Sequence, residues 1–230
     1  PVSAEVLAEN VARVRERIAR AAERAGRDPS EVTLVGVTKE VPPEVAARAV
    51  AAGVTDLGEN YVRELAAKRA AVPGARWHFI GILQSHTAHK VAELADVVET
   101  VASERAATRL ARRAAARGRR LPVLIEVDLT GDRAGVAPED LGAFADRVAG
   151  LEGVELVGLM TVPPIPGTPE DSRPYFRRLR ELRDRLRARH PGAVELSMGM
   201  SLDYEVAVEE GATMVRVGTA LFGPRRRGRA

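Results

Sequence analysis

A lysine at position 39 is unusual in this chain, which otherwise takes its positive charge from arginine. Only Lys39, Lys68 and Lys90 are lysines among 35 basic residues. Lys39 directly follows an apolar, β-branched run, residues 32–38, which is typical of a buried strand. An amine at a strand end can lose its proton and condense with a carbonyl group, whereas a guanidinium cannot. Lys39 is therefore our candidate for a Schiff-base lysine, and a solvated lysine on the rim of a sheet is the alternative.

Small and polar residues follow a later apolar run, where residues 197–201 read SMGMS. Gly199, Met200 and Ser201 precede a stretch with a helical pattern. The free N–H groups and the positive dipole end of a helix start suit an anion. Ordinary helix capping by Ser201, with Asp203 as a first-turn acid, explains the same residues and is compatible with anion binding.

Gly218 and Thr219 follow the last apolar run in the same way. Glycine lets a backbone approach a ligand closely, and threonine adds a hydroxyl donor. Together with the SMGMS segment they predict a phosphate cradle. A phosphorylated carbonyl compound is then the kind of ligand that suits Lys39.

Arg216 lies two residues before Gly218 and therefore on the same face of the predicted strand. We expect it to point into the mouth of the site, where a buried guanidinium needs an acceptor. That acceptor could be a pyridine nitrogen of the ligand, or a carboxylate such as Glu126 or Asp128. A pyridine nitrogen facing arginine stays unprotonated and is a weaker electron sink, which would limit carbanion chemistry.

Short apolar runs and helical patterns alternate along the whole chain and must position these residues. The predicted strands are residues 32–38, 56–58, 77–81, 97–101, 123–129, 155–161, 195–199 and 214–218. The predicted helices between them are residues 43–52, 61–71, 85–95, 103–117, 138–149, 172–189 and 202–210. A further helix, residues 3–25, precedes the first strand.

This alternation predicts an α/β fold of the (β/α)₈ barrel type, as a single domain over residues 1–230. Only a dozen residues follow the last strand, so we expect the N-terminal helix to close the ring in place of a full eighth helix. An open doubly wound sheet is the alternative, but no Gly-rich fingerprint follows the first strand. In such barrels the carboxyl ends of the strands form the active site, with phosphate loops after strands seven and eight. The Pro/Gly-rich residues 165–171 fit a loop on that rim.

The composition excludes several classes of function. The chain has no cysteine, so disulfides, thiolate metal sites and a cysteine nucleophile are excluded. It has no membrane-spanning run and no visible signal peptide, and we expect a cytoplasmic location. No metal-ligand or nucleotide motif is present, so we expect no metal. His78 is expected in the core, and His86, His89 and His190 on the surface.

Two arginine-rich segments raise the possibility of a nucleic-acid partner. Residues 225–229 read RRRGR, and residues 177–189 form a helical pattern that also carries Glu181 and Asp184. We interpret the first as a solvated tail and the second as a mixed, solvated face, and we expect no nucleic-acid partner. No large apolar stripe is evident, so we expect a monomer.

Four ordered blocks resemble the pyridoxal phosphate (PLP) homeostasis family over nearly the whole chain. They are LVGVTK at residues 34–39, GENYVRE at 58–64, WHFIGILQS at 77–85, and LSMGMSLD at 196–203, which continues into GATMVRVGTALFG at 211–223. The resemblance implies a PLP fold-type III barrel like the N-terminal domain of alanine racemase. It also implies a protein that stores, buffers or hands over PLP to enzymes that need it and affects amino-acid balance, without an accepted catalytic reaction.

By the same resemblance, Lys39 would hold PLP as an internal aldimine and Arg216 would face the pyridine nitrogen. Ser201, Gly218 and Thr219 would bind the phosphate. Asn60 would lie near the cofactor, and Ser197 and Met200 belong to the same site. No residue is assigned a catalytic role.

Two departures from the family pattern concern lysines. His86-Thr87 stands where the family usually has Asn-Lys, and residues 128–135 lack the lysine usual after the fifth strand. A role for a second lysine in capturing or releasing PLP is therefore not expected in this chain.

An amino-acid racemase or lyase is the alternative function. Racemisation needs a second acid or base on the opposite face of the cofactor, which alanine racemases take from a separate β domain. The chain ends at Ala230 without such a domain, so we expect a carrier with weak or absent catalysis.

Overall fold

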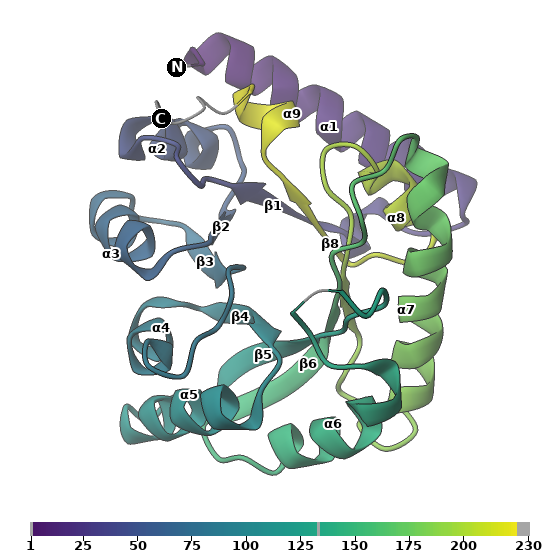
Figure 1. The fold of residues 1–230 in the computed structure, drawn as a ribbon. Coiled ribbons are helices and arrows are strands. Elements are labelled where there is room, and N and C mark those ends of the chain that lie inside the picture. Colours follow the sequence, from purple (N-terminus) through teal and green to yellow (C-terminus); the bar gives the residue numbers. More distant parts are fainter. Residues whose placement is uncertain (1, 133, 225–230) are drawn as a thin grey trace.

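The described residues, 2–132 and 134–224, contain eight parallel strands that pair in chain order, and β8 pairs back to β1 (Figure 1). The closed barrel in this computed structural model confirms the predicted (β/α)₈ fold. Its strands are β1 (Thr33–Val37), β2 (Asp56–Glu59), β3 (Arg76–Phe79), β4 (Val97–Val101), β5 (Leu121–Glu126), β6 (Val154–Met160), β7 (Glu195–Ser197) and β8 (Met214–Val217).

The observed strands coincide with the apolar runs of the sequence, because a strand that is covered on both faces needs apolar residues on both. All five residues of β4 are buried, as expected for a strand between a filled barrel and an outer helix layer. Inside the barrel lies a small apolar cluster: Val35, Val97, Leu124, Met160 and Met214. β5 ends at Glu126, three residues before the predicted end, because residues 127–136 turn back and pair through Val127 and Val136.

Helices cover the outside of the barrel. They are α1 (Ala4–Arg24), α2 (Pro43–Ala51), α3 (Val62–Ala71), α4 (Ala88–Leu94), α5 (Glu104–Ala116), α6 (Leu141–Ala149), α7 (Arg173–Leu186), α8 (Tyr204–Glu209) and α9 (Thr219–Phe222). α4 begins three residues later than predicted, because Thr87 N donates to the carbonyl of Gln84 in a turn. α8 begins two residues later than predicted, because Met200 N donates to Asp203 Oδ1 at 2.8 Å and holds residues 200–203 in a loop.

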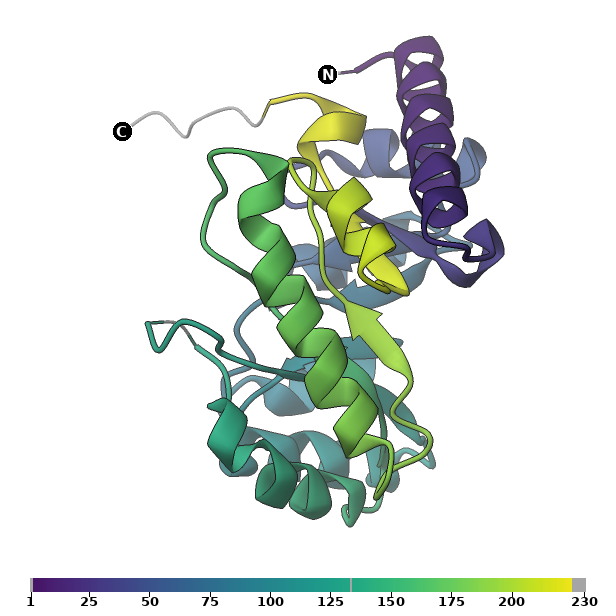
Figure 2. The ribbon, with the colours of Figure 1, turned by 90° about the vertical axis from the view of Figure 1, so that its right-hand side faces the viewer.

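Helix α1 occupies the position that a full eighth outer helix would take. Ser3 caps the N-terminus of α1, where its Oγ accepts a hydrogen bond from Val6 N at 3.2 Å. Its apolar face packs against α8, α9 and α2 (Figures 1 and 2). Asn10 Nδ2 also donates to the carbonyl of Leu221 in α9 at 2.8 Å. The prediction that the N-terminal helix closes the ring is confirmed.

Candidate functional site

Lys39 lies at the carboxyl end of β1, half-buried, at the mouth of the barrel. Within the described part of the chain, no hydrogen bond or ion pair holds its Nζ. The structure places Lys39 at the end of a strand, as predicted. Its amine is free to react with a carbonyl group.

Side chains of α3 fix the backbone on both sides of Lys39. Lys68 Nζ donates to the carbonyl of Thr38, and Glu64 Oε2 accepts from Glu40 N at 3.0 Å. Glu40 has φ +62°, a left-handed conformation that non-glycine residues adopt only when their surroundings impose it. The backbone next to Lys39 is therefore held in one conformation.

Lys68 and Glu59 are the residues near this site that sequence reasoning missed. Lys68 Nζ lies 2.8 Å from Glu59 Oε2, and both side chains are buried. Burial raises the pKa of Glu59, although Lys68 and Thr38 oppose the shift. The rarity of lysine, which singled out Lys39, would have singled out Lys68 as well.

The loop between β7 and α8 is shaped by Gly199. This glycine has φ +100°, and a Cβ there would lie 2.5 Å from Ala207 Cβ, so any side chain would push the loop away from α8. Asp203 fixes the rest of the loop: its Oδ1 accepts from Met200 N at 2.8 Å and its Oδ2 from Ser172 Oγ at 2.6 Å. Asp203 thus connects this loop to the segment before α7.

The loop after β7 is joined directly to the loop after β8. Ser201 Oγ accepts a hydrogen bond from Ala220 N at 3.1 Å, in the first turn of α9. The backbone N–H groups of Ser201 and Thr219 have no protein acceptor in the ranges that the structure describes. Gly218, half-buried, lies between them. Two loops with unused donors therefore lie side by side, as an anion site requires.

A cavity of about 380 Å³ brings most of the predicted residues together. Lys39, Met200, Ser201, Gly218 and Thr219 line it. Residues 162–166, the proline-rich start of the segment between β6 and α7, add an apolar part to the same lining. Of the predicted loop 165–171, Ile165 and Pro166 line the cavity, whereas residues 169–171 belong to a short 3-10 helix, Pro169–Ser172.

Asn60, Ser197 and Arg216 do not line this cavity. Asn60 follows β2 on the same rim. A Cβ at Gly81 would lie 1.9 Å from the carbonyl oxygen of Asn60, so the glycine allows the segment after β3 to contact the segment after β2. Ser197 and Arg216 lie inside the barrel, where both are buried.

The guanidinium of Arg216 has protein acceptors that the sequence did not indicate. Its Nη1 donates to Ser197 Oγ at 2.6 Å and its Nη2 to the carbonyl of Thr161 at 3.0 Å. Burial lowers the pKa of Arg216, while Glu99, Glu126 and Asp203 oppose the shift.

The described residues at the two departures from the family pattern do not line the cavity. His86 is exposed in the turn before α4, and Thr87 is half-buried beside it. In the second departure, Asp128 Oδ1 accepts from Thr130 N and Gly131 N at 3.0 Å, which closes a compact turn. Arg133 and the tail at residues 225–229 fall outside the described residues.

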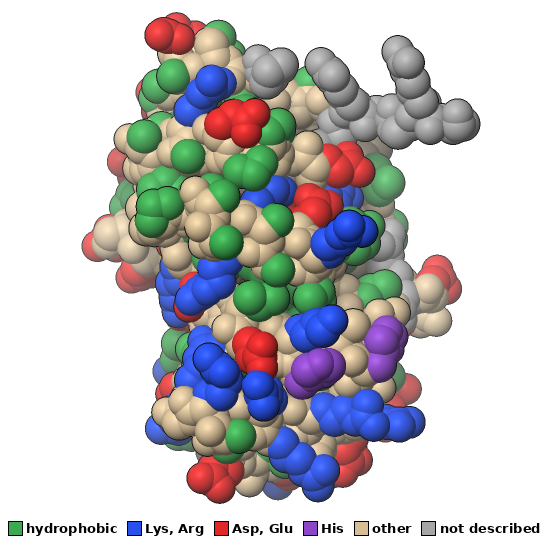
Figure 3. Space-filling model, turned by 90° about the vertical axis from the view of Figure 1, so that its left-hand side faces the viewer, with side chains coloured by type: hydrophobic (Ala, Val, Ile, Leu, Met, Phe, Trp, Pro, Cys, Tyr) green, Lys and Arg blue, Asp and Glu red, His purple; other side chains and the backbone are tan. Residues whose placement is uncertain are grey.

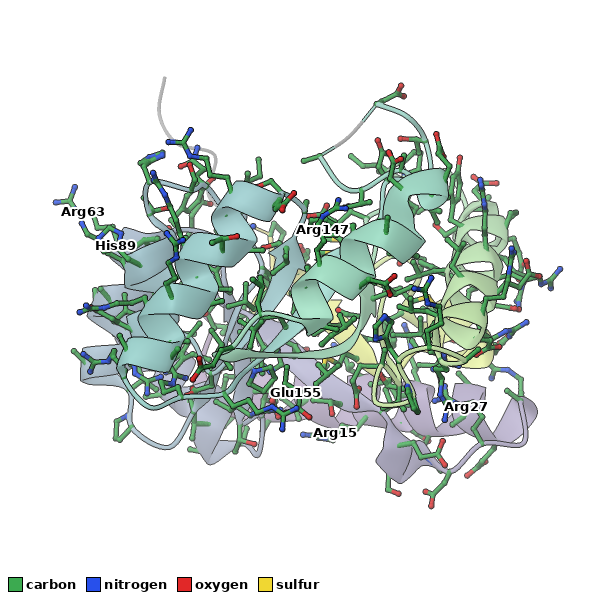
Figure 4. The ribbon with its side chains drawn as sticks, turned by 90° about the horizontal axis from the view of Figure 1, so that it is seen from below. Arg15, Arg27, Arg63, His89, Arg147 and Glu155 are labelled. Atoms are coloured by element: carbon green, nitrogen blue, oxygen red, sulfur yellow. The ribbon has the colours of Figure 1, made fainter. Side chains whose placement is uncertain are left out.

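Helices α4 and α5 carry exposed basic side chains: Lys90, Arg105, Arg109, Arg112 and Arg113. Figure 3 shows Lys and Arg side chains gathered in the lower half of the face that it presents. Arg63 and His89 project outward on the same side (Figure 4). In the arginine-rich residues 177–189 of the sequence, Arg183 contacts Asp184 of the same helix at 2.9 Å, and Arg177 contacts Glu210, which follows α8, at 3.3 Å.

Within the described ranges, no helix is long and apolar enough to cross a membrane, and no cluster of side chains could bind a metal ion.

Known proteins resemble this chain over nearly its full length. Residues 7–226 match the family of the alanine racemase N-terminal domain. A "Pyridoxal phosphate homeostasis protein" of Aquifex aeolicus is 43% identical over 223 residues, which span 95% of this chain and 98% of that protein. The protein of that name from Escherichia coli K12 is 40% identical, over 95% of this chain and 97% of its own length.

Solved structures show the same fold. PipY of Synechococcus elongatus, determined with PLP bound, has a TM-score of 0.84 and 37% identity over 94% of this chain and 100% of its own. Alanine racemase of Clostridium difficile, at 18% identity and a TM-score of 0.75, shares the barrel over 56% of its length. The chain therefore belongs to the pyridoxal phosphate homeostasis proteins, whose barrel is that of the alanine racemase N-terminal domain.

Proposed function

We propose that this protein binds PLP in the cavity at the barrel mouth and takes part in the homeostasis of the free cofactor. The observation that carries the proposal is the meeting of Lys39 with the two loops at Ser201 and Thr219 around one cavity. A free amine and unused backbone donors match the aldehyde and the phosphate of PLP. The PLP-bound structure of PipY, a relative with the same fold, supports this match.

The residues present fit the cofactor. Lys39 would bind the aldehyde carbon as a Schiff base, and Ser201, Gly218 and Thr219 would bind the phosphate. Arg216 would face the pyridine nitrogen from inside the barrel, where Ser197 holds it. Met200 and Asn60 would flank the ring from the rim.

Bound PLP supplies an electrophilic aldehyde and a ring that can accept electrons. Arg216 would keep its own proton, so a ring nitrogen that faces it would stay unprotonated and the ring would be a weak electron sink. Retention of the cofactor is therefore favoured over turnover of an amino acid. We propose that the protein acts as a monomer and passes PLP to enzymes that lack their cofactor.

Absorption spectroscopy of the purified protein with added PLP tests the proposal. We expect a Schiff-base band that borohydride converts to a stable adduct, located by peptide mass spectrometry on Lys39. Lys39→Ala should lack the band, while Lys90→Ala, which removes an exposed lysine, should keep it. An adduct of equal yield in Lys39→Ala would refute the assignment. Amino-acid racemisation that depends on Lys39 would instead support an enzyme.

A further inference from the structure

Five polar side chains form a continuous hydrogen-bonded chain through the interior of the barrel, from Asp56 to Arg216. His78 Nε2 lies 2.7 Å from Asp56 Oδ1, and His78 Nδ1 lies 2.7 Å from Glu99 Oε2. Ser197 Oγ donates to Glu99 Oε1 and accepts from Arg216 Nη1 at 2.6 Å. The chain thus connects β2, β3, β4, β7 and β8.

The geometry requires a protonated His78. Each ring nitrogen faces a carboxylate oxygen, and a carboxylate only accepts, so both nitrogens must carry hydrogen. Burial by itself would lower the pKa of His78, but the hydrogen bonds to Asp56 and Glu99 outweigh it and raise the pKa to about 9. The hydrogen-bonded chain then holds two cations, His78 and Arg216, and two carboxylates, Asp56 and Glu99.

Such a chain is unusual at this place, because branched apolar side chains normally fill the interior of these barrels. His78, Glu99 and Ser197 have no exposed surface, and Arg216 is 2% exposed. Buried ion pairs often stabilise a protein no better than apolar residues of the same volume. The hydrogen-bonded chain is therefore better explained by a role in the site at the barrel mouth than by a contribution to stability.

We propose that His78 and Glu99 are positioning residues for Arg216: Glu99 supplies the countercharge and, through Ser197, holds the guanidinium in one orientation, while His78 holds Glu99 in place. The inference rests on the proposed function, in which Arg216 faces the pyridine nitrogen. Because guanidinium is planar, fixing Nη1 on Ser197 and Nη2 on Thr161 fixes the direction of its other donors.

Other charged groups face the same chain. Glu126 on β5 and Asp203 after β7 also attract Arg216, and Arg76 at the start of β3 lies 3.6 Å from Asp56. Among the carboxylates that attract Arg216, Glu99 is the one joined to it through the Ser197 hydroxyl. Glu126→Gln, which removes a nearby charge on another strand, is therefore a matched control for Glu99→Gln.

The test compares Glu99→Gln, Ser197→Ala and Glu126→Gln with the wild type. We expect Glu99→Gln and Ser197→Ala to weaken PLP binding about tenfold, the effect of losing one charge-assisted hydrogen bond. Glu99→Gln should also lower the pH at which the absorption of the bound chromophore changes, since a less compensated Arg216 disfavours a protonated Schiff base. Glu126→Gln should have a smaller effect on both quantities.

A second measurement uses the cofactor-free protein, so that failure of the proposed function can be told apart from failure of this inference. Arginine side-chain NMR should show slow exchange of an Arg216 N–H in the wild type and in Glu126→Gln. Exchange should be at least tenfold faster in Glu99→Gln and in Ser197→Ala, which retains every charge of the chain. Unchanged exchange in both variants overturns the positioning role, whether or not PLP binds. A wild type that exchanges slowly but forms no Lys39 adduct defeats only the proposed function.

Discussion

Lys68 Nζ lies 2.8 Å from Glu59 Oε2 in the buried layer between β2 and α3, and the same ammonium donates to the carbonyl of Thr38. The residue that precedes Lys39 is therefore anchored to a buried ion pair. Glu64, partly exposed, shares the ammonium at 3.0 Å.

Lys68→Met should destabilise the protein by about 3 kcal/mol at pH 7, because it leaves the Glu59 carboxylate buried without its cation. Burial already raises the pKa of Glu59, and a lower pH favours its protonated form, so the loss should be smaller at pH 5 than at pH 7. Urea unfolding at the two pH values measures both effects. Lys90→Met should change stability little, since Lys90 is exposed. An equal loss at both pH values would contradict the explanation.

The stability of the protein should fall as the pH rises from about 6.5 to 9. Folding raises the pKa of His78 from 6.5 to about 9, so the folded state binds more protons than the unfolded state in this window. The contribution of His78 to the free energy of unfolding is fully present below its pKa in the unfolded state. It is lost as the pH rises through its pKa in the folded state, and amounts to about 3 kcal/mol in total. Urea unfolding across the range and NMR titration of His78 check this. A flat or rising curve would be evidence against a buried imidazolium.

Gly199→Ala should destabilise the protein by about 3 kcal/mol and weaken PLP binding, because it combines a positive φ with a collision against Ala207. Gly142→Ala is the control: a Cβ there meets nothing within 4 Å, and the position lies in α6. Alanine in a helix is favoured over glycine, so Gly142→Ala should stabilise the protein by about 0.5–1 kcal/mol. Thermal unfolding and PLP titration distinguish the two variants. Normal PLP binding by a folded Gly199→Ala would show that the loop conformation is not needed.

Ser201→Ala should weaken PLP binding about tenfold while costing about 1 kcal/mol of stability, because it breaks the link between Ser201 Oγ and Ala220 N. Ser103→Ala removes a comparable bond, from Ala106 N at 3.2 Å, outside the site. It should cost similar stability and leave PLP affinity unchanged. Equal PLP affinity in both variants would argue against Ser201 as a phosphate ligand.

The fold and the position of Lys39 were predictable because they depend on local patterns. Apolar runs mark strands that are buried on both faces, and a lysine directly after such a run must lie at the carboxyl end of the barrel. Ser201, Gly218 and Thr219 came from the same rule, since loops after the last two strands meet in any barrel of this type. The family resemblance added Asn60 and the identity of the ligand.

The partners of Arg216 were not predictable from the same patterns. The sequence suggested Glu126 or Asp128 as a barrel carboxylate, whereas the structure shows Ser197 and Thr161 as acceptors. Which interior side chains meet depends on the stagger between strands, and a sequence pattern within one strand carries no information about that stagger. His78 was expected in the core and is buried there, but its two carboxylate partners depend on the same stagger.

The position of α1 has a consequence for the order in which the chain can fold during synthesis. Its apolar face is covered mainly by α8 and α9, and β1 pairs with β8. Residues 4–24 leave the ribosome before α8 and α9, which cover them. Until then the emerging chain carries an uncovered apolar helix and an unpaired strand edge, which expose it to aggregation. Closure of the ring is therefore a late, long-range step, and folding rate should depend on it more than on any single outer helix.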